Sequence, residues 1–153
     1  MRLWRISDHA SLSGDGGLLG SARWHSRGRR VLYLADHPAS ALLEIMVHVE
    51  VDAEDLPRDY QLLGIDVPED LAVHQLEQGQ LSADWKERVS LTQKIGDVWL
   101  NGGSTALLRV PSAIVPEASN YLLNPGHPDA ARIAIASAIR AAFDPTLMSF
   151  VRS

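Results

Sequence analysis

Short apolar segments in the first half of the chain alternate with a longer amphipathic one, and this pattern predicts strands and a helix. Residues 1–6, 31–35 and 60–68 are apolar runs of about the length of a β-strand. Residues 38–48 carry apolar side chains at helical spacing, and Asp36 lies where a helix cap is expected. Because apolar residues occupy most of the circumference of this helix, we expect it to be covered on several sides.

The second half of the chain continues with one helix and several strand candidates. Residues 82–103 contain a second helix that ends at paired glycines. Residues 105–111 and 112–116 predict two strands, and residues 116–129 predict a loop because prolines interrupt them. Residues 130–143 are ambiguous, since their alanines favour a helix while two alternating isoleucines favour a strand.

Residues 11–24 form the segment richest in glycine, with Gly14, Gly16, Gly17 and Gly20 within seven positions. Such a segment is too rich in glycine for regular structure and predicts an adaptable loop. It lacks the Gly-Lys-Ser/Thr ending of a phosphate-binding P-loop. With no internal repeat and no linker, the chain is expected to be one compact α+β domain over residues 1–153.

Composition excludes several classes of protein. The chain has 153 residues, of which 46% are hydrophobic and 22% are charged, as is ordinary for a globular domain. No apolar run approaches the roughly 20 residues of a membrane helix, and the N-terminus has no apolar signal region. The absence of cysteine excludes disulfides and thiolate chemistry. A cytoplasmic location is therefore the default expectation.

Glu44 is a carboxylate in the middle of the apolar helix predicted at residues 38–48. Ionised carboxylates are uncommon in such surroundings, because desolvation disfavours the charge unless a cation or hydrogen-bond donors compensate for it. One explanation is structural, an internal salt bridge or a hydrogen bond to His48 one turn later. The other is functional, in which Glu44 lines a cleft and faces positive charge on a ligand or transition state.

Other candidate residues have an ordinary structural explanation when each is taken alone. Trp24 and Tyr33 are typical of core aromatics, Ser119 and Asn120 of turn residues, and Arg23 of a surface charge. Together they resemble something more specific, because they lie in two long ordered segments, "GSARWHSRGRRVLYLADHPASALLEIMVHV" and "LLRVPSAIVPEASNYLLNPGHPD".

These two segments resemble the hallmark segments of the RES-domain family, which is named for an arginine, a glutamate and a serine. Those three residues correspond here to Arg23, Glu44 and Ser119. The strings "IGDVWL" and "FDPTL" extend the resemblance over most of the chain. The chain departs from the family at His25, where the family often has asparagine, and at Thr146, where it often has a basic residue.

The resemblance implies a toxin of a bacterial type II toxin–antitoxin pair with an ADP-ribosyltransferase-like fold, a mixed or antiparallel β core flanked by helices. It implies that NAD is the substrate and that the nicotinamide–ribose bond is cleaved, by hydrolysis or phosphorolysis in some members and by ADP-ribosyl transfer to a protein in others. It also implies a cognate Xre-type helix-turn-helix antitoxin that blocks the toxin in a hetero-oligomer. The implied residues are as follows: Arg23, Glu44 and Ser119 as catalytic, Arg23, Trp24, Tyr33, Ser119 and Asn120 as NAD-binding, with His25 and His48 supporting them.

Three rival functions stay open from the residues alone. A metal hydrolase is disfavoured because the chain has no H-E-x-x-H helix, and Glu44 with His48 supplies two ligands where a catalytic zinc takes three. We therefore expect no metal. An RNA-directed toxin would use the four arginines within residues 23–30, although the net charge of −5 (14 minus 19) opposes it. A non-enzymatic module that binds only a protein partner is the third rival.

Overall fold

The computed structural model describes residues 1–48 and 59–147, and their strands form one seven-stranded sheet in the order β4-β5-β6-β2-β1-β3-β7. Neighbouring strands are antiparallel except for β4 and β5, which are parallel. The strands are β1 (Arg2–Ile6), β2 (Leu32–Ala35), β3 (Asp59–Asp66), β4 (Val73–Gln75), β5 (Leu107–Pro111), β6 (Ser119–Leu123) and β7 (Ala134–Ala142). The α-helices are α1 (Gly16–Leu19), α2 (Pro38–His48) and α3 (Val89–Gly102), and the short 3-10 helices are η2 (Gln78–Gln80), η3 (Trp85–Glu87) and η4 (Pro128–Arg132). The α+β class and the mixed sheet are confirmed.

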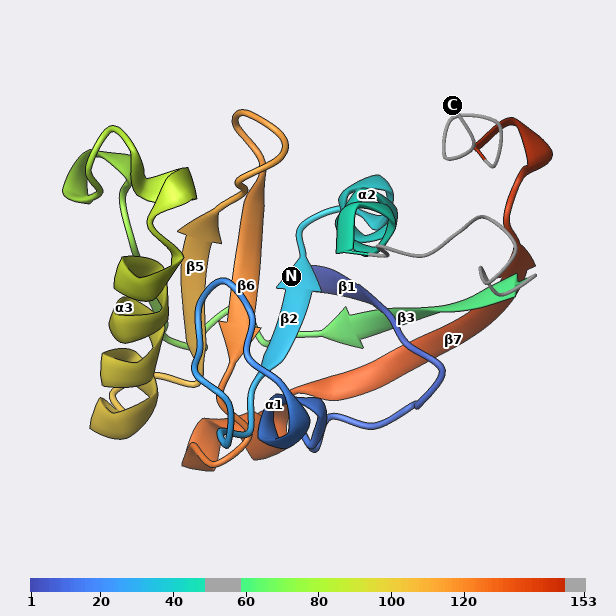
Figure 1. Ribbon diagram of the computed structural model, residues 1–153. Helices are drawn as coiled ribbons and strands as arrows, with labels where there is room; N and C mark the ends of the chain where they lie inside the picture. Colours follow the sequence, from blue (N-terminus) through green and yellow to red (C-terminus); the bar gives the residue numbers. More distant parts are fainter. Residues whose placement is uncertain (49–58, 148–153) are drawn as a thin grey trace.

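The sheet bends strongly, so that β1, β3 and β7 run across β5, β6 and β2 (Figure 1). Apolar side chains from both parts of the sheet meet in one core. Its fully buried members include Leu3 on β1, Leu34 on β2 and Ile65 on β3. Residues alternate between the two faces of a strand. The residues of β2 and β6 that lie next to core residues along the strand therefore point to the opposite face of the sheet.

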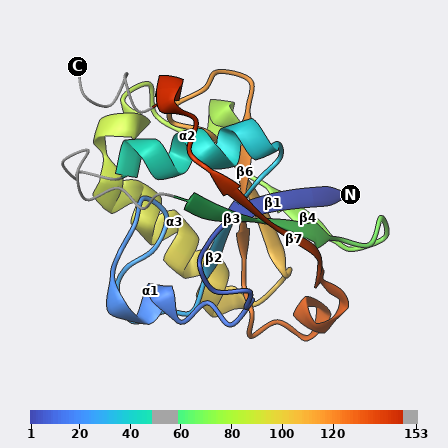
Figure 2. The same cartoon turned by 90° about the vertical axis from the view of Figure 1, so that its right-hand side faces the viewer.

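That opposite face of β5, β6 and β2 packs against α3 and forms a second core. Leu108 and Leu122 from the strands meet Trp99 of α3, together with Trp24 and Trp85. Helix α2 contacts β1 and β2 and lies on the same side of the sheet as α3, as the two ribbon views show together (Figures 1 and 2). The face of β2 and β6 between these helices is where the candidate site is built.

The strands expected within residues 1–6, 31–35, 60–68 and 105–111 are confirmed, as are the helices at 38–48 and within 82–103. In the ambiguous segment 130–143, the strand alternative is correct over β7. Its alanines favour a helix, but pairing along the whole of β3 supplies backbone hydrogen bonds that outweigh this preference.

Several expectations about loops and strands are wrong. Residues 112–116 form no strand, because the chain turns after β5. Residues 119–123 lie in strand β6, within the segment expected to be a loop. The glycine-rich segment contains a short helix, α1, and β4 was not expected at all.

Helix α2 is less covered than its composition predicts. Among the residues whose side chains the structure describes in this helix, Ala41 is buried, while Leu43 and Val47 are exposed to 40% and 55%. The expected cap is also different, since the imidazole Nδ1 of His37 accepts the Ala39 N–H at 3.0 Å. Helix α2 is thus partly exposed, and a functional side chain can lie at the edge of its apolar contact face.

Candidate active site

Glu44 is a partly buried carboxylate that bridges α2 to the β5–β6 connection. Its Oε1 accepts a hydrogen bond from Nδ2 of Asn120 at 2.8 Å and one from Oγ of Ser112 at 3.2 Å. Ser112 is 7% exposed, and its Oγ also accepts the N–H groups of Ile114 and Val115, each at 3.1 Å. Because two backbone donors occupy the oxygen's lone pairs, the hydroxyl hydrogen is left to point at Glu44. The carboxylate is thus held by two oriented donors.

The turn between β5 and β6 explains how Ser112 and Asn120 reach the same acid. Pro111 ends β5, Ser112 then holds the turn through its hydroxyl, and Glu117 takes a positive φ of 68° before β6 begins. The backbone N–H of Ser112 also donates to the carbonyl of Ala118 at 3.0 Å, which closes the turn. Ser112 therefore lies beside the start of the strand that carries Asn120.

Tyr33 lies on the same face of the sheet as Asn120, one step along the strands. Asn120 pairs with Ala35, and Leu122 pairs with Tyr33, in the antiparallel register of β2 and β6. Paired residues and residues two positions apart share a face, and two residues span about 7 Å along a strand. Tyr33 is therefore next to the place where Glu44 is bound.

The hydroxyl of Tyr33 is fixed by the segment that follows the glycine-rich loop. The Trp24 N–H donates to it at 3.1 Å, and Nδ1 of His25 lies 2.8 Å from it. Nε2 of His25 lies 2.8 Å from the Gly20 carbonyl oxygen. Burial raises the pKa of the Tyr33 hydroxyl well above its usual range, and the Trp24 N–H partly opposes this effect. The hydroxyl consequently stays protonated at neutral pH.

Arg23 is the cation of this segment, and its guanidinium is turned toward η3. Nη1 of Arg23 donates to the Lys86 carbonyl at 2.9 Å, and its Cζ lies 5.8 Å from the centre of the Trp85 ring. A guanidinium at this distance from an indole is attracted to the ring. The Thr92 hydroxyl of α3 donates to the Arg23 carbonyl at 2.5 Å, so the main chain of Arg23 is fixed as well.

Helix α3 holds the Ala22–Ser26 backbone through side-chain hydrogen bonds and one close contact. The side-chain amide of Gln93 donates to the Ala22 carbonyl at 2.9 Å, and Asp97 accepts the Ser26 N–H at 3.0 Å. Gly96 lies against Trp24, so closely that a Cβ at this glycine would come within 1.7 Å of the Trp24 carbonyl oxygen. Only glycine allows the helix and this segment to approach so far.

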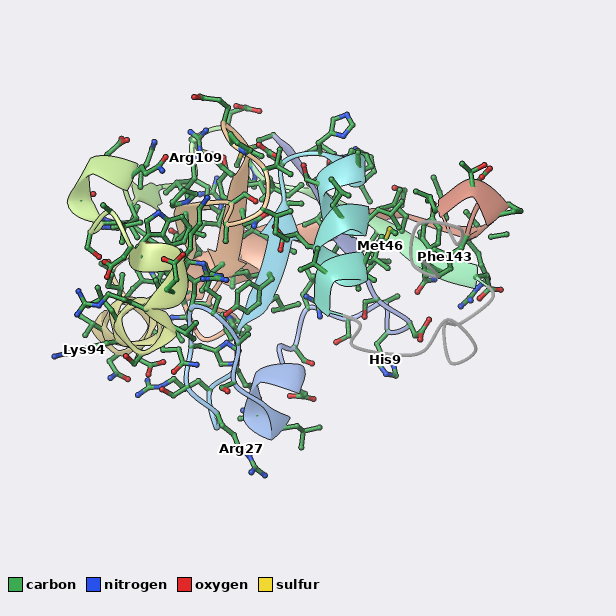
Figure 3. All side chains as sticks on the ribbon, turned by 45° about the horizontal axis from the view of Figure 1, so that its top comes forward. His9, Arg27, Met46, Lys94, Arg109 and Phe143 are labelled. Atoms are coloured by element: carbon green, nitrogen blue, oxygen red, sulfur yellow. The ribbon has the colours of Figure 1, made fainter. Side chains whose placement is uncertain are left out.

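The remaining arginines of residues 23–30 do not form an open basic patch. Arg29 pairs with Asp97 at 3.1 Å and with the Asn101 side chain, while Arg30 pairs with Asp15 at 3.0 Å. Arg27 extends away from the protein at the end of its loop (Figure 3). Local acids therefore pair with two of the four arginines that the sequence concentrates here.

The structure connects several of the residues expected in the site, while the Arg23 guanidinium is turned toward η3. Glu44 and Asn120 are bonded directly, and Tyr33 links their face of the sheet to the segment that carries Arg23, Trp24 and His25. The side chain of His48 lies outside the described part of the chain. That these residues act on NAD stays a prediction.

Ser119 and Ser112 have different surroundings. The Ser119 N–H donates to Asp36 at 3.2 Å, and Ser119 precedes Asn120 on β6, so their side chains point to opposite faces of the sheet. Ser112, which sequence analysis did not select, is the serine bonded to Glu44. Its signal was available, since a serine directly after a strand-ending proline is well placed to accept N–H groups two and three residues later. The role of Ser119 as an NAD contact stays a prediction.

Other features of the described residues lie apart from this site. Among residues 1–48 and 59–147, no three histidine, cysteine, aspartate or glutamate side chains are grouped so that they could hold a metal ion. In the same part of the chain, no helix has the length and apolar character needed to cross a bilayer. An open hollow of about 530 Å³ is lined by Met1, Arg2, Asp66, Val67, Pro68, Arg132 and Ala134, away from Glu44.

Comparison with known proteins assigns the chain to one family and finds a solved structure with the same fold. Residues 2–144 match the model of the RES domain. The chain is 48% identical to "Toxin Res" of Pseudomonas putida over 130 residues, which cover 85% of this chain and 88% of the relative. It is 35% identical to "Prs ADP-ribosylating toxin" of a Sphingobium species over 157 residues, 95% of each chain. The toxin–antitoxin complex MbcT–MbcA of M. tuberculosis contains a chain with the same fold, at a TM-score of 0.76 and 21% identity, over 99% of this chain and 88% of that one.

Proposed function

This chain belongs to the RES-domain family, and we propose that it is the toxin of a type II toxin–antitoxin pair that cleaves the nicotinamide–ribose bond of NAD. The observation that carries this proposal is the Glu44 carboxylate, which two oriented donors hold on the same sheet face as Tyr33. The match of residues 2–144 to the family supports a single ADP-ribosyltransferase-like domain, which we place over residues 1–153. We expect no metal to take part.

The bond to be broken places particular demands on a protein. The nicotinamide nitrogen of NAD is positively charged, so nicotinamide leaves as a neutral molecule with the bonding electron pair and needs no proton. Positive charge then develops on the ribose, in an oxocarbenium-like transition state. Glycosidases meet the same electronic demand with a carboxylate. A preorganised negative group is therefore the essential requirement of the site.

Glu44 supplies that negative group in our proposal. Asn120 Nδ2 and Ser112 Oγ both donate to its Oε1. Fixing one oxygen orients the carboxylate before substrate binds, which is how electrostatic stabilisation avoids the energetic cost of reorganisation in the transition state. Glu44 would stabilise the ribose cation directly or through a ribose hydroxyl.

Arg23 and Tyr33 would bind the two ends of the nicotinamide half of NAD. A guanidinium offers a planar fork of donors and stays charged at neutral pH, which suits the pyrophosphate or the adjacent ribose. The partly buried Tyr33 ring would stack on nicotinamide, and Trp24, which belongs to the apolar cluster against which Tyr33 packs, would line the pocket. Asn120 and Ser119 are the remaining predicted contacts to NAD.

The acceptor of ADP-ribose defines two candidate reactions. Water or phosphate would give hydrolysis or phosphorolysis, with one proton released from the acceptor. A protein side chain would give ADP-ribosyl transfer, and the name of the Sphingobium relative favours this second candidate. Both share the departure of nicotinamide, so Glu44 and Arg23 have the same roles in each.

The partner in this proposal is an antitoxin. The M. tuberculosis chain of the same fold was solved in a toxin–antitoxin complex, which supports a protein partner for this chain. We propose that the antitoxin is of the Xre helix-turn-helix type, forms a hetero-oligomer with the toxin, and meets it in the cytoplasm. The pairing of Arg29 and Arg30 with acids weighs against an RNA-directed toxin.

The proposal is tested by incubating the purified protein with NAD, with and without phosphate, while free nicotinamide and labelled acceptors are followed. We expect nicotinamide release by the wild type and a loss on the order of 10² to 10³ in rate for Glu44→Ala. Glu69→Ala is the matched control, because Glu69 is an exposed acid bonded to the N-terminal ammonium, and its rate should stay unchanged. A folded Glu44→Ala protein with the original rate would remove Glu44 from the mechanism, and salt-dependent RNA binding with NAD untouched would favour the RNA-directed rival.

A further inference from the structure

His25 is a histidine that is 3% exposed and has both ring nitrogens engaged. Nδ1 lies 2.8 Å from the Tyr33 hydroxyl, and Nε2 lies 2.8 Å from the Gly20 carbonyl oxygen. The His25 and Tyr33 ring centres are 5.6 Å apart, with the rings tilted by 47°. This histidine therefore joins two parts of the chain, the end of the glycine-rich segment and strand β2.

The partners of His25 determine which nitrogen carries the hydrogen. A carbonyl oxygen only accepts, so Nε2 must carry a hydrogen and donate to Gly20. In the neutral ring Nδ1 is then an acceptor, and the Tyr33 hydroxyl must donate to it. The same hydroxyl oxygen accepts the Trp24 N–H at 3.1 Å. The hydrogen bonds thus run in one direction, from Trp24 through Tyr33 and His25 to Gly20.

We infer that His25 is a positioning residue that fixes the Tyr33 ring and ties it to the glycine-rich segment at Gly20. The inference rests on the proposed function, in which Tyr33 stacks on nicotinamide. Without an acceptor at Nδ1, the hydroxyl hydrogen of Tyr33 would lose its partner in a largely buried place. Tyr33 would then leave the position that the Trp24 N–H and Nδ1 define together, and nicotinamide would lose an oriented surface.

Two substitutions separate the two hydrogen bonds of His25. In His25→Asn, the amide oxygen occupies the place of Nδ1 and can still accept from Tyr33, while the reach to Gly20 is lost. In His25→Gln, the longer side chain places its nitrogen near the site of Nε2 and can donate to Gly20, while the acceptor for Tyr33 is displaced. His74→Asn, at an exposed position on β4, is the control.

We expect kcat/KM for NAD to fall about tenfold in His25→Gln, as the loss of one hydrogen bond predicts, and less than about threefold in His25→Asn. The loss should be coupled to Tyr33, so that His25→Gln adds no further loss to Tyr33→Phe. A merely structural role for His25 predicts losses that follow stability and add independently of Tyr33. Equal losses in the Asn and Gln variants, or full additivity with Tyr33→Phe, would overturn the inference.

A second measurement does not depend on activity. Nitrogen-15 NMR of the histidines should find His25 with hydrogen on Nε2, and Tyr33→Phe should move the Nδ1 resonance while His74 stays unchanged. Hydrogen on Nδ1 in the wild type would overturn the inference even if NAD is cleaved. If the wild type cleaves no NAD, the proposed function fails, and the NMR result alone decides whether His25 positions Tyr33.

Discussion

Replacing Gly96 by alanine tests whether the close approach of α3 holds the Ala22–Ser26 segment, which carries Arg23, in place. The added Cβ would lie 1.7 Å from the carbonyl oxygen and 2.8 Å from the carbonyl carbon of Trp24. Ordinary contact needs about 3.5 Å, so the helix and the segment must separate by roughly 1.8 Å. The clash is with backbone, which has no alternative rotamer, so the side chains alone cannot relieve it.

That separation is expected to cost more than the alanine gains. The contacts at risk are the hydrogen bonds from Thr92 and Gln93 to the segment and the Ser26 N–H bond to Asp97. Three hydrogen bonds contribute about 3 kcal/mol together, at about 1 kcal/mol each. The better helix propensity of alanine returns about 1 kcal/mol. We therefore expect Gly96→Ala to lower the free energy of unfolding by about 2 kcal/mol, which corresponds to roughly 4–8 °C in Tm for a chain of this size.

The assay is urea unfolding of Gly96→Ala beside Gly102→Ala, a control near the end of the same helix. A Cβ at Gly102 would meet no atom within 4 Å, so this variant should be as stable as the wild type or more stable by up to about 1 kcal/mol. NAD cleavage should fall in Gly96→Ala under conditions where it remains folded, because Arg23 moves with the segment. If Gly96→Ala matched Gly102→Ala in stability and cleavage, the close approach of α3 would have no role in holding the site.

Three further substitutions, with Ser119→Ala as a control for one of them, test the site itself. Arg23→Lys should keep the fold but lower kcat/KM for NAD by about tenfold or more, since an ammonium lacks the planar fork of donors; unchanged kinetics would contradict this role. Ser112→Ala should reduce nicotinamide release and cost about 1–3 kcal/mol in urea unfolding, because two N–H groups and Glu44 lose a partner, whereas Ser119→Ala should change stability little. The raised pKa of Tyr33 means that above pH 10 the unfolded chain loses a proton that the folded chain keeps, so stability falls as pH rises there. In Tyr33→Phe this part of the alkaline loss should disappear, and an unchanged slope of unfolding free energy against pH would refute the burial of this hydroxyl.

Local signals explain which elements the sequence predicts correctly. Helices α2 and α3 have apolar residues at helical spacing over 11 and 14 residues, long enough for the period to be clear. Strand β6 lacks such a local signal, because it begins with two polar residues and lies between prolines. It becomes a strand because β2 and β5 pair with it on either side. Strand β5 comes directly before it in the chain, whereas β2 is far away in the sequence.

The same distinction holds for the site. Glu44 is conspicuous in the sequence because a charge interrupts an apolar helix. Ser112 is inconspicuous, since its importance depends on an acid 68 positions away that only the folded sheet brings to it. Ser119 is selected through the resemblance to the RES-domain family. Because neighbouring residues of a strand face opposite sides, the position of its side chain relative to Asn120 becomes clear only in the folded sheet.

The order of strands in the sheet also determines the point in translation at which the residues around Glu44 can come together. A nascent chain that has reached residue 110 already contains Arg23, Tyr33 and Glu44, but Ser112 and Asn120, which donate to the Glu44 carboxylate, have not yet been made. Strand β2 has no neighbour on one side until β6 leaves the ribosome. The carboxylate can therefore meet Ser112 and Asn120 only after residues 1–120 have been synthesised, and any shorter nascent chain lacks the arrangement on which the proposed function depends.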